Sequence, residues 1–250
     1  MIIVKGLTGA TSYTQRFECS ANKIALAVEA AQRSDIDSSF VTILLVDAFG
    51  QQKVITPRTR LGDLMEIAAS NEGFIEEKDT YSSGSLSKVN VLGTIELSNF
   101  GSVDLAGGYG QIQVDGAVST TKWDFYGVDS ADLTNMIIDY RPIWSAANQY
   151  KECDVRDAYA IAIPVSNLVE LQMSYQNGRT LIFKPEELEA ITNETNEIAE
   201  LIQNYGGNGA TKVVAGHNAL FCIGVKYVNS IRVQYTANTT FYKVSDAVLQ

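Results

Sequence analysis

The sequence predicts an all-β protein with inserted helices, divided into two tandem domains. One segment of strand, turn and strand occurs twice, at residues 41–57 and 169–185. Much of the remaining chain consists of short runs of alternating apolar and polar residues separated by glycines, which is typical of antiparallel β proteins. We place the two domains at residues 1–145 and 146–250, each of ordinary single-domain size.

The repeated segment reads VTILLVDAFGQQKVITP in the first copy and VELQMSYQNGRTLIFKP in the second. The copies align without a gap at a shift of 128 positions, from Val41 to Val169. Apolar residues alternate ahead of a glycine in both copies, which is the period of a half-buried strand. Asn177-Gly178 is a strong hairpin signal, because both residue types tolerate positive φ. The repeat therefore predicts a β-hairpin in each half of the chain.

A helix is predicted after each copy of the repeat. Pro57 and Pro185 close the two hairpins, and proline suits the first turn of a helix because no N–H donor is needed there. The helices are expected over residues 58–70 and 186–204. The apolar face of the first helix consists of Leu61, Leu64, Met65 and Ala68. The halves therefore share an order of strands, hairpin, helix and further strands, which indicates a duplicated domain.

The rest of the chain predicts strands and polar loops. Residues 34–39 and 76–90 are polar, and we expect both to form exposed loops. Residues 117–150 connect the two halves. Further strands are expected over residues 17–28, 91–98, 111–115, 158–165, 219–227, 230–235 and 239–244.

Composition narrows the classes of function. The net charge of −10, from 19 basic and 29 acidic residues, argues against a protein that wraps nucleic acid, because such proteins need a basic surface. No apolar run approaches the roughly 20 residues that cross a bilayer, and we expect no signal peptide. Three widely spaced cysteines without a C-x-x-C pair predict neither a disulfide framework nor a zinc site.

The single histidine, His217, restricts the possible chemistry. Histidine-based metal sites of cupins, zinc hydrolases and non-haem iron enzymes each need at least two histidines. We therefore expect no cofactor. Weak calcium binding by Asp35 and Asp37 stays open, although the remaining ligands of an EF-hand are missing.

Two groups of residues are candidate contacts. Residues 1–17 carry Lys5 and Arg16 but no acid, so they could form an N-terminal arm that lies on a neighbouring molecule or an anionic lipid surface. The alternative is an ordinary first strand. Trp123 and Trp144 could form a platform on which a glycan stacks, and the alternative is packing in a core or an interface.

The chain resembles the double jelly-roll major capsid proteins of tailless, membrane-containing icosahedral bacteriophages, such as those of the corticovirus and finnlakevirus groups. The resemblance rests on the two copies at 41–57 and 169–185, each followed by a helix. It implies two tandem eight-stranded jelly rolls and a structural role without enzymatic activity. It also implies pseudo-hexameric homotrimers, packed into an icosahedral capsid lattice over an internal membrane.

The same resemblance implies partners and a location. The partners would be further copies of the chain, other capsid or vertex proteins and the internal viral membrane, with no direct contact to nucleic acid. The protein would be assembled in the host cytoplasm and would reside in the virion. Two alternatives remain open: a phage spike or receptor- or carbohydrate-binding β-sandwich protein, and a glycosidase with paired carboxylates from Glu96, Asp104 and Asp115.

Overall fold

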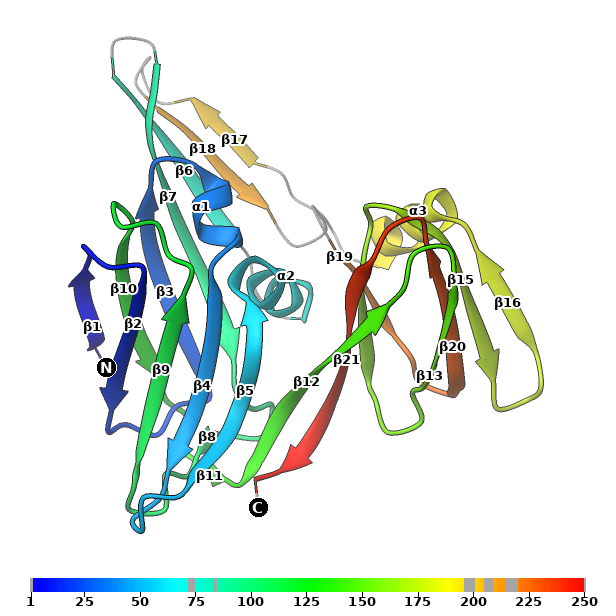
Figure 1. Ribbon diagram of the computed structural model, residues 1–250, viewed down its shortest axis with the longest axis horizontal. Helices are drawn as coiled ribbons and strands as arrows, with labels where there is room; N and C mark the ends of the chain where they lie inside the picture. Colours follow the sequence, from blue (N-terminus) through cyan, green and yellow to red (C-terminus); the bar gives the residue numbers. More distant parts are fainter. Residues whose placement is uncertain are drawn as a thin grey trace. The chain divides into compact units, whose positions relative to one another are not determined.

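The computed structural model describes residues 2–71, 75–82, 85–195, 201–204, 209–214 and 220–249. Strands dominate this part of the chain and lie in several mostly antiparallel sheets, so the predicted all-β class with inserted helices is confirmed. The chain forms two compact units (Figure 1). Unit 1 comprises residues 1–138, 198–216 and 247–250, and unit 2 comprises residues 139–197 and 217–246.

Unit 1 contains two large sheets. Their strand orders are β1-β10-β3-β7-β6-β18-β17 and β2-β9-β4-β5, and a short parallel pair joins β8 to β11. The elements are β1 (Ile2–Leu7), β2 (Ser12–Phe17), β3 (Lys23–Ala30), α1 (Arg33–Asp37), β4 (Phe40–Val46), β5 (Gln52–Arg60), α2 (Leu61–Asn71), β6 (Ile75–Ser82), β7 (Ser85–Glu96), β8 (Ser102–Val103), β9 (Tyr109–Asp115), β10 (Lys122–Val128), β11 (Leu133–Thr134), β17 (Leu201–Asn204) and β18 (Gly209–Val214).

Unit 2 contains two four-stranded sheets. Their strand orders are β12-β21-β14-β19 and β13-β20-β15-β16. The elements are β12 (Met136–Ser145), β13 (Tyr150–Asp154), β14 (Ala160–Pro164), β15 (Leu168–Tyr175), β16 (Thr180–Phe183), α3 (Pro185–Thr195), β19 (Leu220–Gly224), β20 (Val228–Tyr235) and β21 (Thr239–Val248).

The two units repeat one order of strands. Unit 1 contains the runs β1-β10-β3-β7 and β2-β9-β4-β5, and unit 2 contains β12-β21-β14-β19 and β13-β20-β15-β16. The runs contain eight strands in each unit. When these eight are numbered in chain order, the strand order of the two runs is the same in both units, and β4–β5 correspond to β15–β16. These two hairpins are the segments that repeat in the sequence, so the repeat extends from one hairpin to the arrangement of eight strands.

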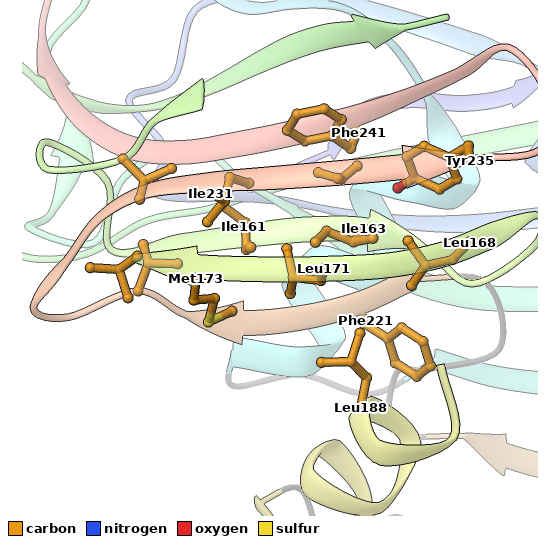
Figure 2. Close-up of a cluster of buried hydrophobic side chains, with 14 residues drawn as sticks. Ile161, Ile163, Leu168, Leu171, Met173, Leu188, Phe221, Ile231, Tyr235 and Phe241 are labelled. Atoms are coloured by element: carbon orange, nitrogen blue, oxygen red, sulfur yellow. The ribbon is translucent and has the colours of Figure 1, made fainter. Parts of the chain in front are cut away.

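Alternating apolar residues build a separate core in each unit. In unit 1, the buried residues of β3 are Ile24, Leu26, Val28 and Ala30, and α2 adds Leu61, Leu64, Met65 and Ala68, the apolar face expected from the sequence. In unit 2, Leu188 on α3 lies beside Phe221 of β19 at one end of the core (Figure 2). The core of unit 2 consists of Val155, Ile161, Ile163, Leu168, Leu171, Met173, Leu188, Phe221, Val225, Val228, Ile231, Val233, Tyr235 and Phe241.

The helix after the first hairpin begins later than predicted. Strand β5 runs through Pro57 to Arg60, so α2 starts at Leu61. Because β5 is the last strand of its sheet, a residue without an N–H group is tolerated there, and the register between β4 and β5 shifts close to this point. In the second copy, Pro185 opens α3 as expected.

Two predicted loops contain regular structure. Residues 34–39 include most of the short helix α1. Within residues 76–90, the structure places β6 and the first half of β7, which pair with each other. The polar sequence of β6 led to the prediction of a loop. A strand is tolerated there in part because a charged side chain has a partner: the Glu77 carboxylate accepts a hydrogen bond from Arg33 at 3.2 Å.

The predicted helix over 186–204 is wrong in its last part. Helix α3 ends at Thr195, and residues 201–204 form strand β17, which pairs with β18. Strand β18 pairs in turn with β6 of unit 1, so this hairpin from the second half of the chain extends a sheet of the first unit. The units therefore differ from the predicted division into 1–145 and 146–250, both in residues 198–216 and in a border at residues 138 and 139.

The N-terminal residues are strands, not a free arm. Strand β1 pairs with β10, and β2 pairs with β9, so residues 2–7 and 12–17 lie in the two large sheets of unit 1. The structure therefore agrees with the alternative prediction, in which residues 1–17 are an ordinary part of the first domain's sheets.

Candidate interaction surfaces

The outward faces of the two equivalent hairpins carry different side chains. In β4, Val41, Ile43 and Leu45 are buried in the core, and the intervening residues Thr42, Leu44 and Val46 point to the opposite face. In β15, Leu171 and Met173 are buried, and the intervening residues are Glu170, Gln172 and Ser174. The core positions are therefore apolar in both units, whereas the opposite face carries the buried apolar residues Leu44 and Val46 in β4 and polar residues in β15.

Two arginines cover aromatic rings on the sheet β2-β9-β4-β5. The Arg16 guanidinium lies 3.8 Å from the ring centre of Tyr109, and the Arg58 guanidinium lies 3.7 Å from that of Phe40. Contacts of this kind stabilise both the cation and the apolar ring it covers. Arg16 also forms an ion pair with Glu18 at 2.9 Å.

The candidate arm residues are not brought together. Lys5 lies on β1 and Arg16 on β2, strands of two different sheets. Arg16 is held by an aromatic ring and a carboxylate of its own unit.

Glu170 is the centre of a polar cluster on the outer face of unit 2. Its Oε1 accepts hydrogen bonds from the Tyr150 hydroxyl at 2.6 Å and from Gln172 Nε2 at 2.7 Å, and its Oε2 accepts one from Lys184 Nζ at 2.8 Å. The Arg232 guanidinium lies 4.5 Å from the ring centre of Tyr150. We call these five residues the Glu170 cluster.

The contacts of Glu170 change its acidity. The hydrogen bond from Lys184, followed by those from Tyr150 and Gln172, lowers the pKa of Glu170 from 4.5 to about 2. The same carboxylate raises the pKa of the Tyr150 hydroxyl. The cluster comes from β13, β15, β20 and the residue after β16, so sequence reasoning missed it. The only local signal was the alternation of Glu170 and Gln172 with apolar residues.

A second charged contact links β21 to the turn between β13 and β14. The Lys243 side chain is only 7% exposed, and its Nζ donates to both carboxylate oxygens of Asp157 at 2.9 Å. This hydrogen bond lowers the pKa of Asp157. In the same turn, hydrogen bonds from Arg156 lower the pKa of Asp154 to about 2. The Lys243–Asp157 contact ties β21 to this turn, whereas the Asp154–Arg156 pair is local and exposed.

The two candidate glycan-binding tryptophans lie in different units and surroundings. Trp123 on β10 is fully buried in unit 1 and stacks on Phe125, with ring centres 6.0 Å apart. Its predicted role as a glycan platform is therefore wrong, because a buried ring cannot receive a sugar. Trp144 on β12 has 60% of its surface exposed and remains available for a contact.

The candidate carboxylates each have a different neighbour. Glu96 accepts a hydrogen bond from Asn71 at 3.0 Å, Asp104 accepts one from the amide of Ala106 at 2.9 Å, and Asp115 lies 3.7 Å from Arg58. These contacts stabilise a strand end, a turn and a sheet face respectively.

The candidate metal ligands Asp35 and Asp37 also have partners within the protein. The carboxylate of Asp37 pairs with Arg33 at 2.7 Å, and that of Asp35 accepts a hydrogen bond from Gln32 at 3.0 Å. His217 lies outside the described residues. In the described part of the chain, no three His, Cys, Asp or Glu side chains lie together as metal ligands would. None of the helices described there is long and apolar enough to span a membrane.

Comparison with known proteins gives only weak similarities. No family model matches the chain, and no curated protein matches it. Among solved structures, it is similar to the PBSX exported protein XepA, with 10% identity and a TM-score of 0.24 over 99% of this chain and 86% of that one. It is also similar to an oxalate decarboxylase, with 8% identity and a TM-score of 0.25 over 95% of this chain and 70% of that one. At these TM-scores neither similarity establishes a shared fold.

Proposed function

We propose that the chain is a structural shell protein, built from two tandem eight-stranded jelly rolls, that assembles as trimers into a viral capsid. The observation that carries the proposal is the strand order. With the eight matched strands of each unit numbered in chain order, both units contain one sheet ordered 1-8-3-6 and another ordered 2-7-4-5. A jelly roll distributes eight antiparallel strands over two sheets through two Greek keys, and this order follows that pattern.

The duplication supports an assembled role. A chain with two similar barrels can place six barrels in a ring with only three copies, which gives a trimer with near-sixfold outline and closed symmetry. The resemblance to double jelly-roll capsid proteins leads to the same arrangement, in an icosahedral shell over an internal membrane. A net charge of −10 suits a shell that does not touch the genome directly.

A glycan-binding protein is the second candidate. Jelly rolls occur in lectins as well as in capsids, and a fold alone does not fix a function. The specific observation in its favour is Trp144, whose ring is exposed on β12. A glycan array with specific binding that is lost in Trp144→Ala would support this candidate over the shell.

The mass of the purified chain in solution tests the shell proposal. We expect light scattering to give the mass of three chains, because obligate interfaces bury upwards of about 2,000 Å² and persist on dilution. Electron micrographs should then show ring-like particles. A chain that stays monomeric at high concentration would contradict the proposal.

A further inference from the structure

Each unit has one sheet that ends in a hairpin strand of the repeated segment. Strand β5 is the last strand of the sheet β2-β9-β4-β5, and β16 is the last strand of β13-β20-β15-β16. Within the described residues, no further strand pairs with either of them. An open strand edge presents unpaired N–H and C=O groups, to which another chain can add.

Val54 on β5 and Ile182 on β16 occupy the same position in these two edges. They are related by the 128-residue shift of the repeat. Val54 lies opposite Leu44, and Ile182 lies opposite Gln172, the residue that corresponds to Leu44. Val54 is 53% exposed and Ile182 is 55% exposed, so neither belongs to a core.

The exposed apolar character of this position is retained while its neighbours differ. On the faces of the central strands turned away from the core, Leu44 of unit 1 corresponds to Gln172 of unit 2, and Val46 corresponds to Ser174. Leu44 and Val46 are nevertheless buried, unlike Val54. Packing in the core explains why the inward positions are apolar in both copies. It does not explain why both copies have an apolar residue at a position that is exposed to solvent. A contact with another molecule does explain it, because burial there stabilises an apolar side chain.

Both edges also carry basic side chains on either side of the apolar residue. Lys53 and Arg58 flank Val54, whereas Arg179 and Lys184 flank Ile182. Arg58 is already paired with Asp115 at 3.7 Å and Lys184 with Glu170 at 2.8 Å, which leaves Lys53 and Arg179 to attract a partner. Between Arg179 and Lys184, β16 has neither a charged residue nor a proline, which usually protect an open edge, whereas β5 contains Lys53, Pro57 and Arg58. A surface of this kind attracts an acidic partner, and a chain of net charge −10 is itself acidic.

We propose that the edges formed by β5 and β16 bind further copies of this chain, with Val54 and Ile182 at the centre of the contacts. This inference rests on the proposed function as a shell protein. If both barrels of every chain have equivalent neighbours in the assembly, each unit must make the same contact at the same position. The repeated edge supplies it.

The test is the variant Val54→Asp/Ile182→Asp, examined by light scattering over a dilution series and by electron microscopy. Both side chains are exposed, so the variant should unfold at nearly the wild-type temperature. We expect its dissociation constant for assembly to rise about tenfold or more, because a charge enters each apolar contact. The matched control, Val118→Asp/Leu133→Asp, adds the same charge at exposed apolar positions outside the two edges and should assemble like the wild type.

The outcomes separate the inference from the proposed function. If the wild type assembles and the edge variant assembles equally well, the edges do not join copies and the inference is overturned. The same conclusion follows if the control variant is impaired as much as the edge variant. If the wild type itself is monomeric, the proposed function fails, and the inference fails with it.

Discussion

Gly50 and Gly178 lie 128 positions apart and adopt the same left-handed backbone conformation, with φ of +81° at both. The amide of each donates a hydrogen bond of 3.0 Å to the carbonyl oxygen three residues earlier, on Asp47 and Tyr175. The two hairpins therefore share their turn geometry as well as their place in the order of strands. Residues with side chains rarely adopt this conformation, which explains why both copies keep a glycine there.

Replacing either turn glycine by alanine should destabilise the fold. We expect Gly50→Ala and Gly178→Ala each to lower the free energy of unfolding by about 1–2 kcal/mol through backbone strain, since no atom lies within 4 Å of the added carbon. Urea denaturation measures the change. Gly224→Ala is the control, because Gly224 does not have a positive φ and its nearest atom is 3.9 Å away. A Gly178→Ala variant as stable as this control would contradict the prediction.

The Glu170 cluster should make unit 2 sensitive to acid. The folded pKa of Glu170 is about 2, below its ordinary value of 4.5, so its stabilising contribution is complete above pH 4.5 and disappears as the pH falls to about 2. We therefore expect the stability difference between wild type and Glu170→Gln to shrink over that range, as measured by thermal unfolding. Glu186→Gln removes the same charge from the first turn of α3 and serves as the control. A difference that is constant from pH 7 to pH 2 would exclude this role.

The two tryptophans should respond differently to removal. Trp123→Ala leaves a cavity in the core of unit 1 and should cost about 3–5 kcal/mol of stability. Trp144→Ala removes an exposed ring and should change stability by less than about 0.5 kcal/mol. Denaturant titration of both variants measures the contrast. Equal losses would mean that Trp144 is also buried in the folded protein.

Deleting residues 1–17 should unfold unit 1. The deletion removes β1 from beside β10 and β2 from beside β9, so one edge of each large sheet is lost. Hydrogen exchange should show that the amides of β9 and β10 lose protection. A truncated chain that keeps this protection and forms trimers, but no longer forms shells, would instead restore the reading of these residues as an arm.

Local patterns predicted the parts of the fold that local forces determine. The hairpins at 41–57 and 169–185 follow from alternation and a turn glycine, and the buried face of α2 follows from helical spacing. Strand β6 was missed because its polarity is compensated by partners that lie far away in sequence, such as Arg33 for Glu77. A local pattern cannot supply such pairings.

The candidate surfaces were harder to predict for the same reason. The Glu170 cluster depends on the register of four strands, which decides that Tyr150, Gln172 and Lys184 reach one carboxylate. Trp123 was a candidate contact because tryptophan is common at binding surfaces, but its place on the inward side of β10 puts it in the core. Residue type suggested the candidates, and strand register decided among them.

The most direct test of the shell account is an image of the purified assembly by cryo-electron microscopy. The account predicts a particle of three chains in which six β-barrels form a ring with near-sixfold outline, each chain contributing two adjacent barrels. A particle with another number of chains, or a chain that remains single at the highest concentration reached, would contradict it.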